Sequence, residues 1–446
     1  MHTLVAQFTN LHGVAKGKFV PLDQLDGLLR EGAGFSGPSI AGTGLPRTGP
    51  RSEYWGRGDA ATATVLPWLP GHARIVCDGL VDGQPFEACP RQVLRRQVAR
   101  LAERGWRLAT GIEPEFFLLR QEAGRWLPAD AADRLDKPSY DLKSLPRQRD
   151  FLLALRRALE AAGLTVLQLD HEDAQGQYEV NFGYDDVLAS ADHLMLFKLA
   201  AHTLAEERGM VFSMMPKPFA NQPGSGMHFH VSLWEGDGDG HGESDGDAAC
   251  NLFAPVRGAA ASAAPAHLSA LGQQFAAGVL AHSAALTALA APTVNSYRRL
   301  GVRDSLSGTN WAPVWVAHGP NNRSALVRTL PGRFEWRLPD ASANPYLASA
   351  ALIAAGLDGI DRALPLPPPC DDDLFDCTPA EAARRGIARL PATLDAALDA
   401  LAADPVVCGA LGPVLTGQFL QLKRTECAEH AAHVSDWELA RYADAY

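Results

Sequence analysis

The sequence has no C-x-x-C pair and no sign of a disulfide framework. Its seven cysteines, among 446 residues, are odd in number and scattered along the chain. Such a pattern is typical of reduced thiols and predicts a cytoplasmic protein. The N-terminus, MHTLVAQFTNLHGVAKGKFVPL, has no basic stretch followed by a continuous apolar core. We therefore do not interpret it as a secretory signal.

Long apolar runs and a basic stripe are also missing. The longest apolar tracts, such as residues 341–357, are interrupted by polar residues and are too short to span a membrane. The net charge of −11 leaves no basic surface that could neutralise nucleic-acid phosphates. We therefore expect neither a membrane nor a nucleic-acid partner. A hydrophobic content of 47% and a charged content of 20% are ordinary for a globular protein.

The chain divides near residue 90. Before this point, short strand-like runs alternate with Gly- and Pro-rich loops, and after it an amphipathic segment, RQVLRRQVARLAERG, has helical periodicity. Helical and strand-like segments then alternate, which predicts an α+β protein with domains at residues 1–89 and 90–446. The acidic tract 235–247, EGDGDGHGESDGD, lacks the ordered ligand series of a calcium loop. We expect a solvated hairpin loop there.

Four segments place charged or polar side chains at alternate positions within apolar surroundings. They are GSGMHFHVSL (224–233), GIEPEFFLL (111–119), DHEDAQGQYEVNF (170–182) and GRFEWRL (332–338). Because alternate residues of a strand share one face, each segment projects its polar set to one side. The residues concerned are Glu113, Glu115, Gln177, Glu179, Asn181, His228, His230, Ser232, Arg333, Glu335 and Arg337.

Taken singly, each segment has an ordinary structural explanation. An E-x-E strand is most often a solvated face, an H-x-H pair is most often packed or on the surface, and an R-x-E-x-R strand usually makes cross-strand ion pairs. Their coincidence in four segments favours an enzyme site, because isolated buried carboxylates lose several kcal/mol of hydration. Hard carboxylate oxygens with an imidazole suit Mg²⁺ or Mn²⁺ better than zinc.

These segments also resemble the signature blocks of the glutamine synthetase superfamily. In order along the chain the matching blocks are GIEPEF, HEDAQGQYEV, PGSGMHFHVSL, APTVNSYRRL, NNRSALVR and FEWRLPDASANPYLASAALIAAGLDGID. The resemblance runs from GFSGPSI near the N-terminus to the last helices. DHEDAQGQYEVNF, MPKPFANQPGSGMHFH and HVSDWELARY look most like the glutamate–methylamine ligase branch, γ-glutamylmethylamide synthetases also called type III glutamate–ammonia ligases.

The resemblance implies a fold and a reaction. The fold would be a small N-terminal β-grasp-like domain followed by a larger catalytic domain with a curved antiparallel sheet. The reaction would be ATP-dependent: glutamate becomes γ-glutamyl phosphate, and an amine then displaces the phosphate. The resemblance also implies a homo-oligomer of two stacked hexameric rings, a dodecamer, with active sites between neighbouring subunits.

The same resemblance assigns roles to single residues. Two or three Mg²⁺ or Mn²⁺ ions would bind in each site. Glu115, Glu172 and Glu179 would hold the ion next to glutamate and the amine, and Glu113, His228 and Glu335 would hold the ion next to the ATP phosphates. Glutamate would be bound by Gly224, Arg299 and Arg337. ATP and the transferred phosphoryl group would be contacted by His230, Ser232, Arg323, Arg328 and Arg333, with Arg323 as a catalytic residue.

The amine pocket departs from the ammonia-using pattern. Where ammonia-using members carry an aspartate and a glutamate, this chain has Ser36 and Trp311, which favours an alkylamine. Asp170 and Asp173 are then the nearest acids that could bind the ammonium group and accept its proton, and Tyr140 could lie beside them. Ammonia, ethanolamine or a polyamine stay open as substrates. A non-catalytic structural role is disfavoured, because all six implied metal ligands are present.

Overall fold

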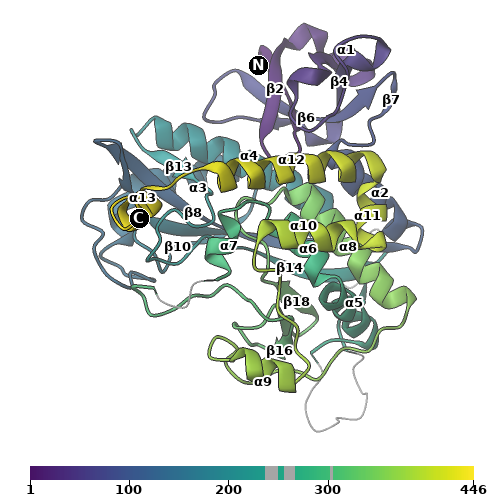
Figure 1. The fold of residues 1–446 in the computed structure, drawn as a ribbon. Helices are drawn as coiled ribbons and strands as arrows, with labels where there is room; N and C mark the ends of the chain where they lie inside the picture. The colour runs from purple at the N-terminus through teal and green to yellow at the C-terminus, as the bar shows by residue number, and fades with distance from the viewer. Residues whose placement is uncertain (237–249, 256–266, 302–304) are drawn as a thin grey trace.

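The computed structural model describes residues 1–236, 250–255, 267–301 and 305–446 (Figure 1). The acidic tract 235–247, expected as a hairpin loop, lies almost entirely outside the described residues. The described residues form two β-sheets with helices packed around them, which confirms the α+β class.

The N-terminal region forms a mixed sheet. β1 (Thr3–Thr9) pairs antiparallel with β2 (Ala15–Pro21) and parallel with β6 (His72–Val81). Parallel strands need a crossover connection, and the segment between β2 and β6 contains α1 (Leu25–Arg30). This arrangement agrees with the expected β-grasp-like domain. The other strands of the region are β3 (Ala33–Ser36), β4 (Glu53–Gly58), β5 (Thr64–Val65) and β7 (Gln84–Pro85).

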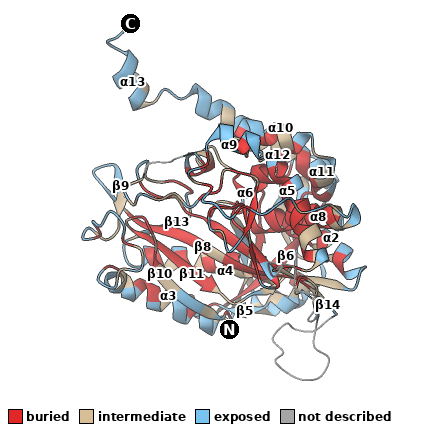
Figure 2. Cartoon of the chain, turned by 90° about the horizontal axis from the view of Figure 1, so that it is seen from below, coloured by how far each residue is buried: buried red, intermediate tan, exposed pale blue. Residues whose placement is uncertain are grey.

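The larger sheet is built around β8 (Trp106–Glu122), a strand of 17 residues. Its other strands in the described residues are β9 (Arg125–Pro128), β10 (Val166–His171), β11 (Gln177–Phe182), β12 (Asp185–Asp186), β13 (Val211–Ser213), β14 (Met227–Glu235), β15 (Cys250–Asn251), β16 (His318–Pro320), β17 (Val327–Leu330) and β18 (Arg333–Trp336). The main path runs β10-β11-β8-β14-β18-β17-β16, and all its pairings but β16–β17 are antiparallel. β8 and β11, neighbours on this path, are largely buried (Figure 2).

Helices cover the larger sheet. Those described are α2 (Pro90–Ala102), α3 (Arg149–Ala161), α4 (Val187–Glu206), α5 (Ala270–Ala281), α6 (Ser283–Ala290), α7 (Ser296–Arg299), α8 (Pro345–Asp361), α9 (Pro379–Arg384), α10 (Leu394–Ala402), α11 (Pro405–Leu411), α12 (Pro413–Ala432) and α13 (Asp436–Tyr442). The apolar tract 341–357 lies largely in α8, which is almost entirely buried. Glycines let α5 approach it: a Cβ on Gly278 would lie 2.1 Å from the Ala355 carbonyl oxygen.

A buried arginine connects the N-terminal sheet to the helices. Arg91 in α2 donates hydrogen bonds to Asp59 at 3.0 Å and Asp78 at 2.9 Å, and to Asp192 in α4 at 2.8 Å. Buried apolar residues of both regions, from Leu4 to Phe419, also belong to one contiguous cluster. The division into domains 1–89 and 90–446 falls between β7 and α2 and stays a prediction.

No single helix in the described part of the chain has both the length and the apolar composition of a membrane span. One strongly bent pair, Pro405–Leu411 with Pro413–Tyr442, passes the length and composition test only when its two parts are taken together. The C-terminal end of this pair, including α13, projects away from the rest of the chain (Figure 2).

Candidate active site

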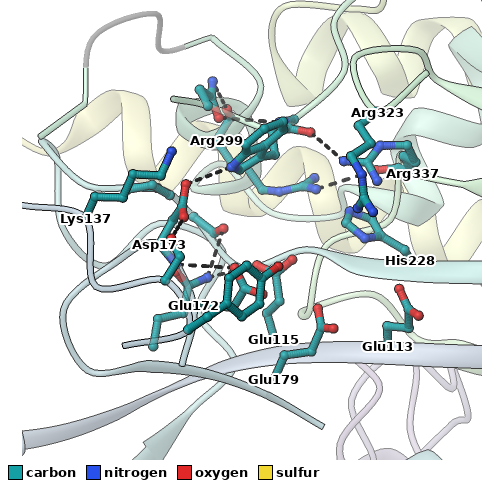
Figure 3. Close-up of a pocket in the computed structure, with 18 of the residues that line it drawn as sticks. Glu113, Glu115, Lys137, Glu172, Asp173, Glu179, His228, Arg299, Arg323 and Arg337 are labelled. Atoms are coloured by element: carbon teal, nitrogen blue, oxygen red, sulfur yellow. Dashed lines mark hydrogen bonds between the residues drawn. The ribbon is translucent and has the colours of Figure 1, made fainter. Parts of the chain in front are cut away.

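A cavity of about 590 Å³ opens over one face of the larger sheet (Figure 3). Glu113, Glu115 and Glu179 rise from neighbouring strands on one side of it, and Arg323 and Arg337 lie across from them (Figure 3). Residues that are far apart in the sequence therefore surround one space with opposite charges.

Strand register explains why the carboxylates meet. Asp170 in β10 pairs with Glu179 in β11, and Glu179 pairs with Glu115 in β8. Directly paired residues carry their side chains on the same face, with Cβ atoms about 5 Å apart. Three acids from three strands therefore form one row.

A second set of pairs continues this polar face. Glu113, two residues before Glu115 on β8, pairs with His228 in β14. His230 pairs with Glu335 in β18, and Glu335 pairs in turn with Arg328 in β17. The alternate spacing predicted from the sequence thus becomes a continuous polar face across neighbouring strands.

Asp170, Glu172 and Glu179 form a compact acidic group, with ligand oxygens all within 4.8 Å of one another. Burial raises the pKa of Glu172 and of Glu179 well above the usual value, and the neighbouring carboxylates raise both further. Burial also raises the pKa of Asp170 to about 6, with the charge of Glu113 adding to the shift. Carboxylates this close resist ionising together unless a cation is added. Their oxygens fit a hard divalent ion such as Mg²⁺ or Mn²⁺.

Glu115 lies beside this group but is already hydrogen-bonded. Its Oε2 accepts from Gln177 Nε2 at 2.8 Å and from the backbone N–H of Gly226 at 2.9 Å. Burial raises its pKa to about 7, although Arg299 and the Gly226 bond act in the opposite direction. A Cβ on Gly226 would lie 2.9 Å from both Glu115 Oε1 and His228 Nε2. The glycine-rich loop thus gives the close backbone approach that the sequence predicts.

Glu113, His230 and Glu335 form a second compact group, again within 4.8 Å. His230 Nε2 lies 3.1 Å from Glu113 Oε1, and His228 Nδ1 lies 3.4 Å from Glu335 Oε1. Burial and then Arg337 lower the pKa of His228 well below its usual value, so its imidazole is neutral. Its Nε2 is buried and has no hydrogen-bond partner among the described residues. Both histidines therefore lie where they could bind a cation.

Glu335 is the anionic centre of this second group. Arg337 donates to its Oε1, and Arg328 Nη1 donates to its Oε2 at 2.8 Å. Burial alone would raise the pKa of Glu335, but the charge of Arg337 and the hydrogen bond from Arg328 hold it well below its usual range. The carboxylate is therefore ionised although it is buried.

Two more arginines lie in or beside the site: Arg299 lines the cavity, and Arg333 contacts His230. Arg299 is buried and donates through Nη1 to the Leu338 carbonyl oxygen at 3.1 Å. Arg333 Nε donates to His230 Nδ1 at 3.3 Å. A Cβ on Gly224 would lie 2.3 Å from the Pro216 carbonyl oxygen, so only glycine fits at this point of the wall. Guanidinium groups beside a carboxylate face can hold an anionic substrate against bound cations.

One side of the cavity is organised by Asp173. Its Oδ2 accepts from Thr309 Oγ1 at 2.6 Å and from the indole N–H of Trp311 at 2.7 Å. Ser139 Oγ donates to its Oδ1. Tyr140 lines the same cavity and has the left-handed backbone conformation, with φ of 58°. The Asp173 carboxylate thus connects its own loop with the loop that contains Ser139 and the loop that contains Thr309 and Trp311.

Residues 87–442, most of the chain, match the sequence model of the glutamine synthetase catalytic domain. The chain belongs to the glutamine synthetase family. It is 46% identical over 442 residues to a glutamate–methylamine ligase of Methyloversatilis universalis, across 99% of this chain and 96% of that protein. It is 36% identical over 433 residues to a glutamine synthetase of Rhizobium leguminosarum bv. phaseoli, across 97% and 94%. A solved GmaS–ADP complex has a similar fold, with a TM-score of 0.89 and 34% identity over 100% and 97% of the two chains.

Membership of the glutamine synthetase family confirms the resemblance found in the motif blocks and the predicted class of enzyme, a ligase. Most of the residues with implied roles line the cavity described above. They are Glu113, Glu115, Tyr140, Glu172, Asp173, Glu179, Gly224, His228, Arg299, Trp311, Arg323, Glu335 and Arg337. Their individual roles stay predictions.

Other implied residues do not line this cavity. Asp170 belongs to the acidic group with Glu172 and Glu179, where the resemblance implied Glu115. His230 belongs to the group with Glu113 and Glu335, where the resemblance implied His228. The side chain of Ser232 accepts from Trp234 Nε1 at 2.9 Å. Ser36 lies in β3 of the N-terminal sheet, where it accepts from Ser39 Oγ at 3.1 Å. Arg328 and Arg333 meet the site through the bonds described above.

Two residues of the site, Gln177 and Asn181, were predicted on the polar face but without a role, and two others were not predicted. Gln177 positions Glu115, and Asn181 Nδ2 donates to Glu179 Oε1 at 2.8 Å; their alternation with Glu179 was the available signal. Lys137 and Ser139 line the cavity from an irregular loop without periodicity. No local pattern in the sequence marks these two residues as part of the site.

Proposed function

We propose that this protein ligates L-glutamate to methylamine at the expense of ATP, giving γ-N-methylglutamine, ADP and phosphate. The observation that carries the proposal is the amine side of the cavity, where the indole of Trp311 lies hydrogen-bonded to Asp173. An aromatic surface can contact a methyl group, whereas ammonium would gain more from a second carboxylate. The 46% identity to a glutamate–methylamine ligase supports the same substrate.

The first chemical step is activation of glutamate. A carboxylate is a poor electrophile, so ATP must convert the γ-carboxylate to γ-glutamyl phosphate. This transfer demands positioning and charge neutralisation more than covalent participation by the protein. Arg299 and Arg337 would grip a glutamate carboxylate, beside the backbone of Gly224. Contacts to ATP and the transferred phosphoryl group would come from His230, Ser232, Arg323, Arg328 and Arg333.

We propose that two or three Mg²⁺ or Mn²⁺ ions bind in this cavity. When bound, they would neutralise the phosphate oxygens and orient ATP. The proposed ligands are Glu113, Glu115, Glu172, Glu179, His228 and Glu335, and the compact groups add Asp170 and His230 as candidates. The raised pKa values of the buried acids support this assignment, because the acids lack enough positive charge of their own.

The second step is attack by the amine on γ-glutamyl phosphate, which expels phosphate. An alkylammonium with a reference pKa of about 10.4 is a free amine in only about one molecule in a few thousand at neutral pH. Asp173 would bind the ammonium group and accept its proton. Three side-chain donors, from Ser139, Thr309 and Trp311, fix the direction of the Asp173 carboxylate oxygens. Asp170 is a second candidate, although its place in the acidic group favours cation binding.

We further propose a cytoplasmic dodecamer of two stacked hexameric rings. The projecting C-terminal segment exposes Val434, Trp437, Leu439 and Tyr442, an apolar surface that a partner subunit would cover. Ser36, in β3 of the N-terminal sheet, does not line the cavity of its own chain, which suits contribution to a neighbouring subunit's amine pocket. Native mass spectrometry tests the proposal, and a monomeric mass at assay concentration would contradict it.

The proposed function predicts a clear amine preference. We expect kcat/KM for methylamine to be at least tenfold above that for ammonia, about 1.4 kcal/mol of transition-state preference. The measurement is ATP- and glutamate-dependent phosphate release with Mg²⁺, comparing methylamine, ethylamine, ethanolamine, putrescine and ammonia. Preference for ammonia would contradict the proposal, and absence of release with every amine would favour a structural role.

The same assay can test the amine site separately from the glutamate site, with a variant of Asp173. In Asp173→Asn the neighbouring donors keep an acceptor, but the negative charge that holds the ammonium is lost. We expect this variant to raise the KM for methylamine about tenfold or more while the KM for glutamate changes little. An unchanged methylamine KM would remove Asp173 from the amine site.

A further inference from the structure

A second cavity, of about 640 Å³, adjoins the reaction cavity. Asn310, Trp311 and Ala312 line both cavities, so this short segment lies between the two spaces. Nothing in the proposed reaction uses this second cavity. It is large enough for a small organic molecule to pass through or reside in.

Trp311 is the main side chain of this wall. Its indole N–H donates to Asp173 on the reaction side, at 2.7 Å. Its ring meets Phe375, a residue of the second cavity, edge to face with centroids 6.0 Å apart. The backbone oxygen of Trp311 also accepts from Arg337 Nη2 at 3.2 Å. The Trp311 ring is therefore held by Asp173 on the side of the reaction cavity and by Phe375 on the side of the second cavity, and it lines both.

The second cavity has the chemistry of a site for organic cations. Trp315 and Phe375 add aromatic surface to that of Trp311, and Asp373 and Asp376 add two carboxylates against one guanidinium, that of Arg389. Aromatic faces attract ammonium groups within about 6 Å of the ring centroid. Glutamate and ATP carry several negative charges, and this surface disfavours them.

The structure already places a primary ammonium group against the partition. Lys137 Nζ, from the reaction side, lies 5.9 Å from the centroid of the Trp311 ring. The side chain of lysine is an alkylammonium, so this contact has the same chemistry as a bound amine substrate. The indole face is thus accessible to a group of this type.

Resting on the proposed function, we infer that the second cavity is an antechamber that admits the alkylammonium substrate, and that Trp311 is the partition limiting the length of its alkyl chain. A methyl group needs only the space beside the indole. A longer chain on an amine bound at Asp173 would run into the ring. Without the ring, the cavities of about 590 and 640 Å³ would merge and the chain could extend into the antechamber.

The partition is tested with Trp311→Ala, assayed with methylamine, n-butylamine and putrescine. We expect the ratio of kcat/KM for butylamine to that for methylamine to rise at least tenfold over wild type, about 1.4 kcal/mol. Trp311→Phe is the matched control: it lacks the bond to Asp173 but keeps a ring in the wall, so its ratio should stay near that of wild type. An unchanged ratio in Trp311→Ala would overturn the inference.

The antechamber is tested separately with the double variant Asp373→Asn/Asp376→Asn. We expect the KM for methylamine to rise three- to tenfold at low ionic strength, with the difference shrinking at high salt because exposed charges are screened. The KM for glutamate should stay constant. Asp371→Asn/Asp372→Asn removes the same two charges from exposed acids of the same stretch that do not line the cavity, and is the charge-matched control.

These results are distinguishable from a failure of the proposed function. A wild-type enzyme that prefers ammonia would refute that function whatever the variants do. A wild-type enzyme that prefers methylamine, with either unchanged selectivity in Trp311→Ala or an unchanged methylamine KM in the double aspartate variant, would refute the antechamber inference and leave the proposed function intact.

Discussion

Replacing Glu335 by glutamine is expected to reduce kcat/KM by about a thousandfold or more, a loss of roughly 4 kcal/mol in transition-state stabilisation. Glu335 is only 1% exposed and accepts hydrogen bonds from Arg328 and Arg337. Glutamine keeps the shape but removes the charge that balances both arginines and that would attract a cation with Glu113 and His230. Steady-state kinetics with ATP, glutamate and methylamine measure the effect.

The same variant should also be less stable. Removing one partner of a buried ion pair leaves uncompensated charge and costs about 3–5 kcal/mol. Glu122→Gln is the matched control, because Glu122 pairs with Arg120 at the end of β8 but its side chain is 62% exposed. Such surface pairs contribute at most about 1 kcal/mol. Activity of Glu335→Gln within tenfold of wild type would contradict the role assigned to this group.

The polar strands could be predicted because their signal is local. In β8, β11, β14 and β18 the charged residues alternate with apolar ones, and this periodicity alone identifies both a strand and its polar face. The partners of each strand were not predictable in this way. The pairings of Glu179 with Glu115 and of His230 with Glu335 join residues 64 and 105 positions apart, and no local pattern encodes such a register.

Within the candidate site, too, local periodicity identifies polar residues but does not predict their contact partners. His228 and His230 lie on one face of β14, so periodicity cannot decide which of them meets Glu113 and Glu335. Trp311 was found because it departs from a family pattern, but its bond to Asp173 depends on how two loops pack. Ser139, the third donor to this carboxylate, comes from a loop without periodicity. Irregular loops contribute to the site through tertiary contacts that the sequence does not display.

Removing divalent cations is expected to abolish ligase activity and to make the protein less stable as pH rises. Without metal, the folded protein holds Glu115 at a pKa of about 7 and Asp170 at about 6, and the pKa values of Glu172 and Glu179 are also raised. Unfolding returns these acids to reference values of about 4. Activity should return when Mg²⁺ is restored after chelation.

The direction of the pH effect follows from proton binding. Between about pH 4 and pH 7 these buried acids bind more protons in the metal-free folded state than in the unfolded state, so the stability that they contribute is greatest at low pH and is lost as pH rises through their folded pKa values. For Glu115 alone, a shift from 4.5 to about 7 corresponds to roughly 3 kcal/mol as an upper limit. A bound cation balances the ionised carboxylates, and its affinity grows as their protons leave.

The increase in Tm produced by Mg²⁺ should therefore be small near pH 5.5 and much larger near pH 8. Thermal denaturation with chelator or with Mg²⁺ at several pH values measures it. Glu115→Gln removes one of the shifted acids, so the metal-free variant should show a shallower loss of stability with pH than wild type. A Tm increase that is the same at every pH would mean that these acids do not release protons to bind the cation, and the proposed metal ligands would have to be sought elsewhere in the cavity.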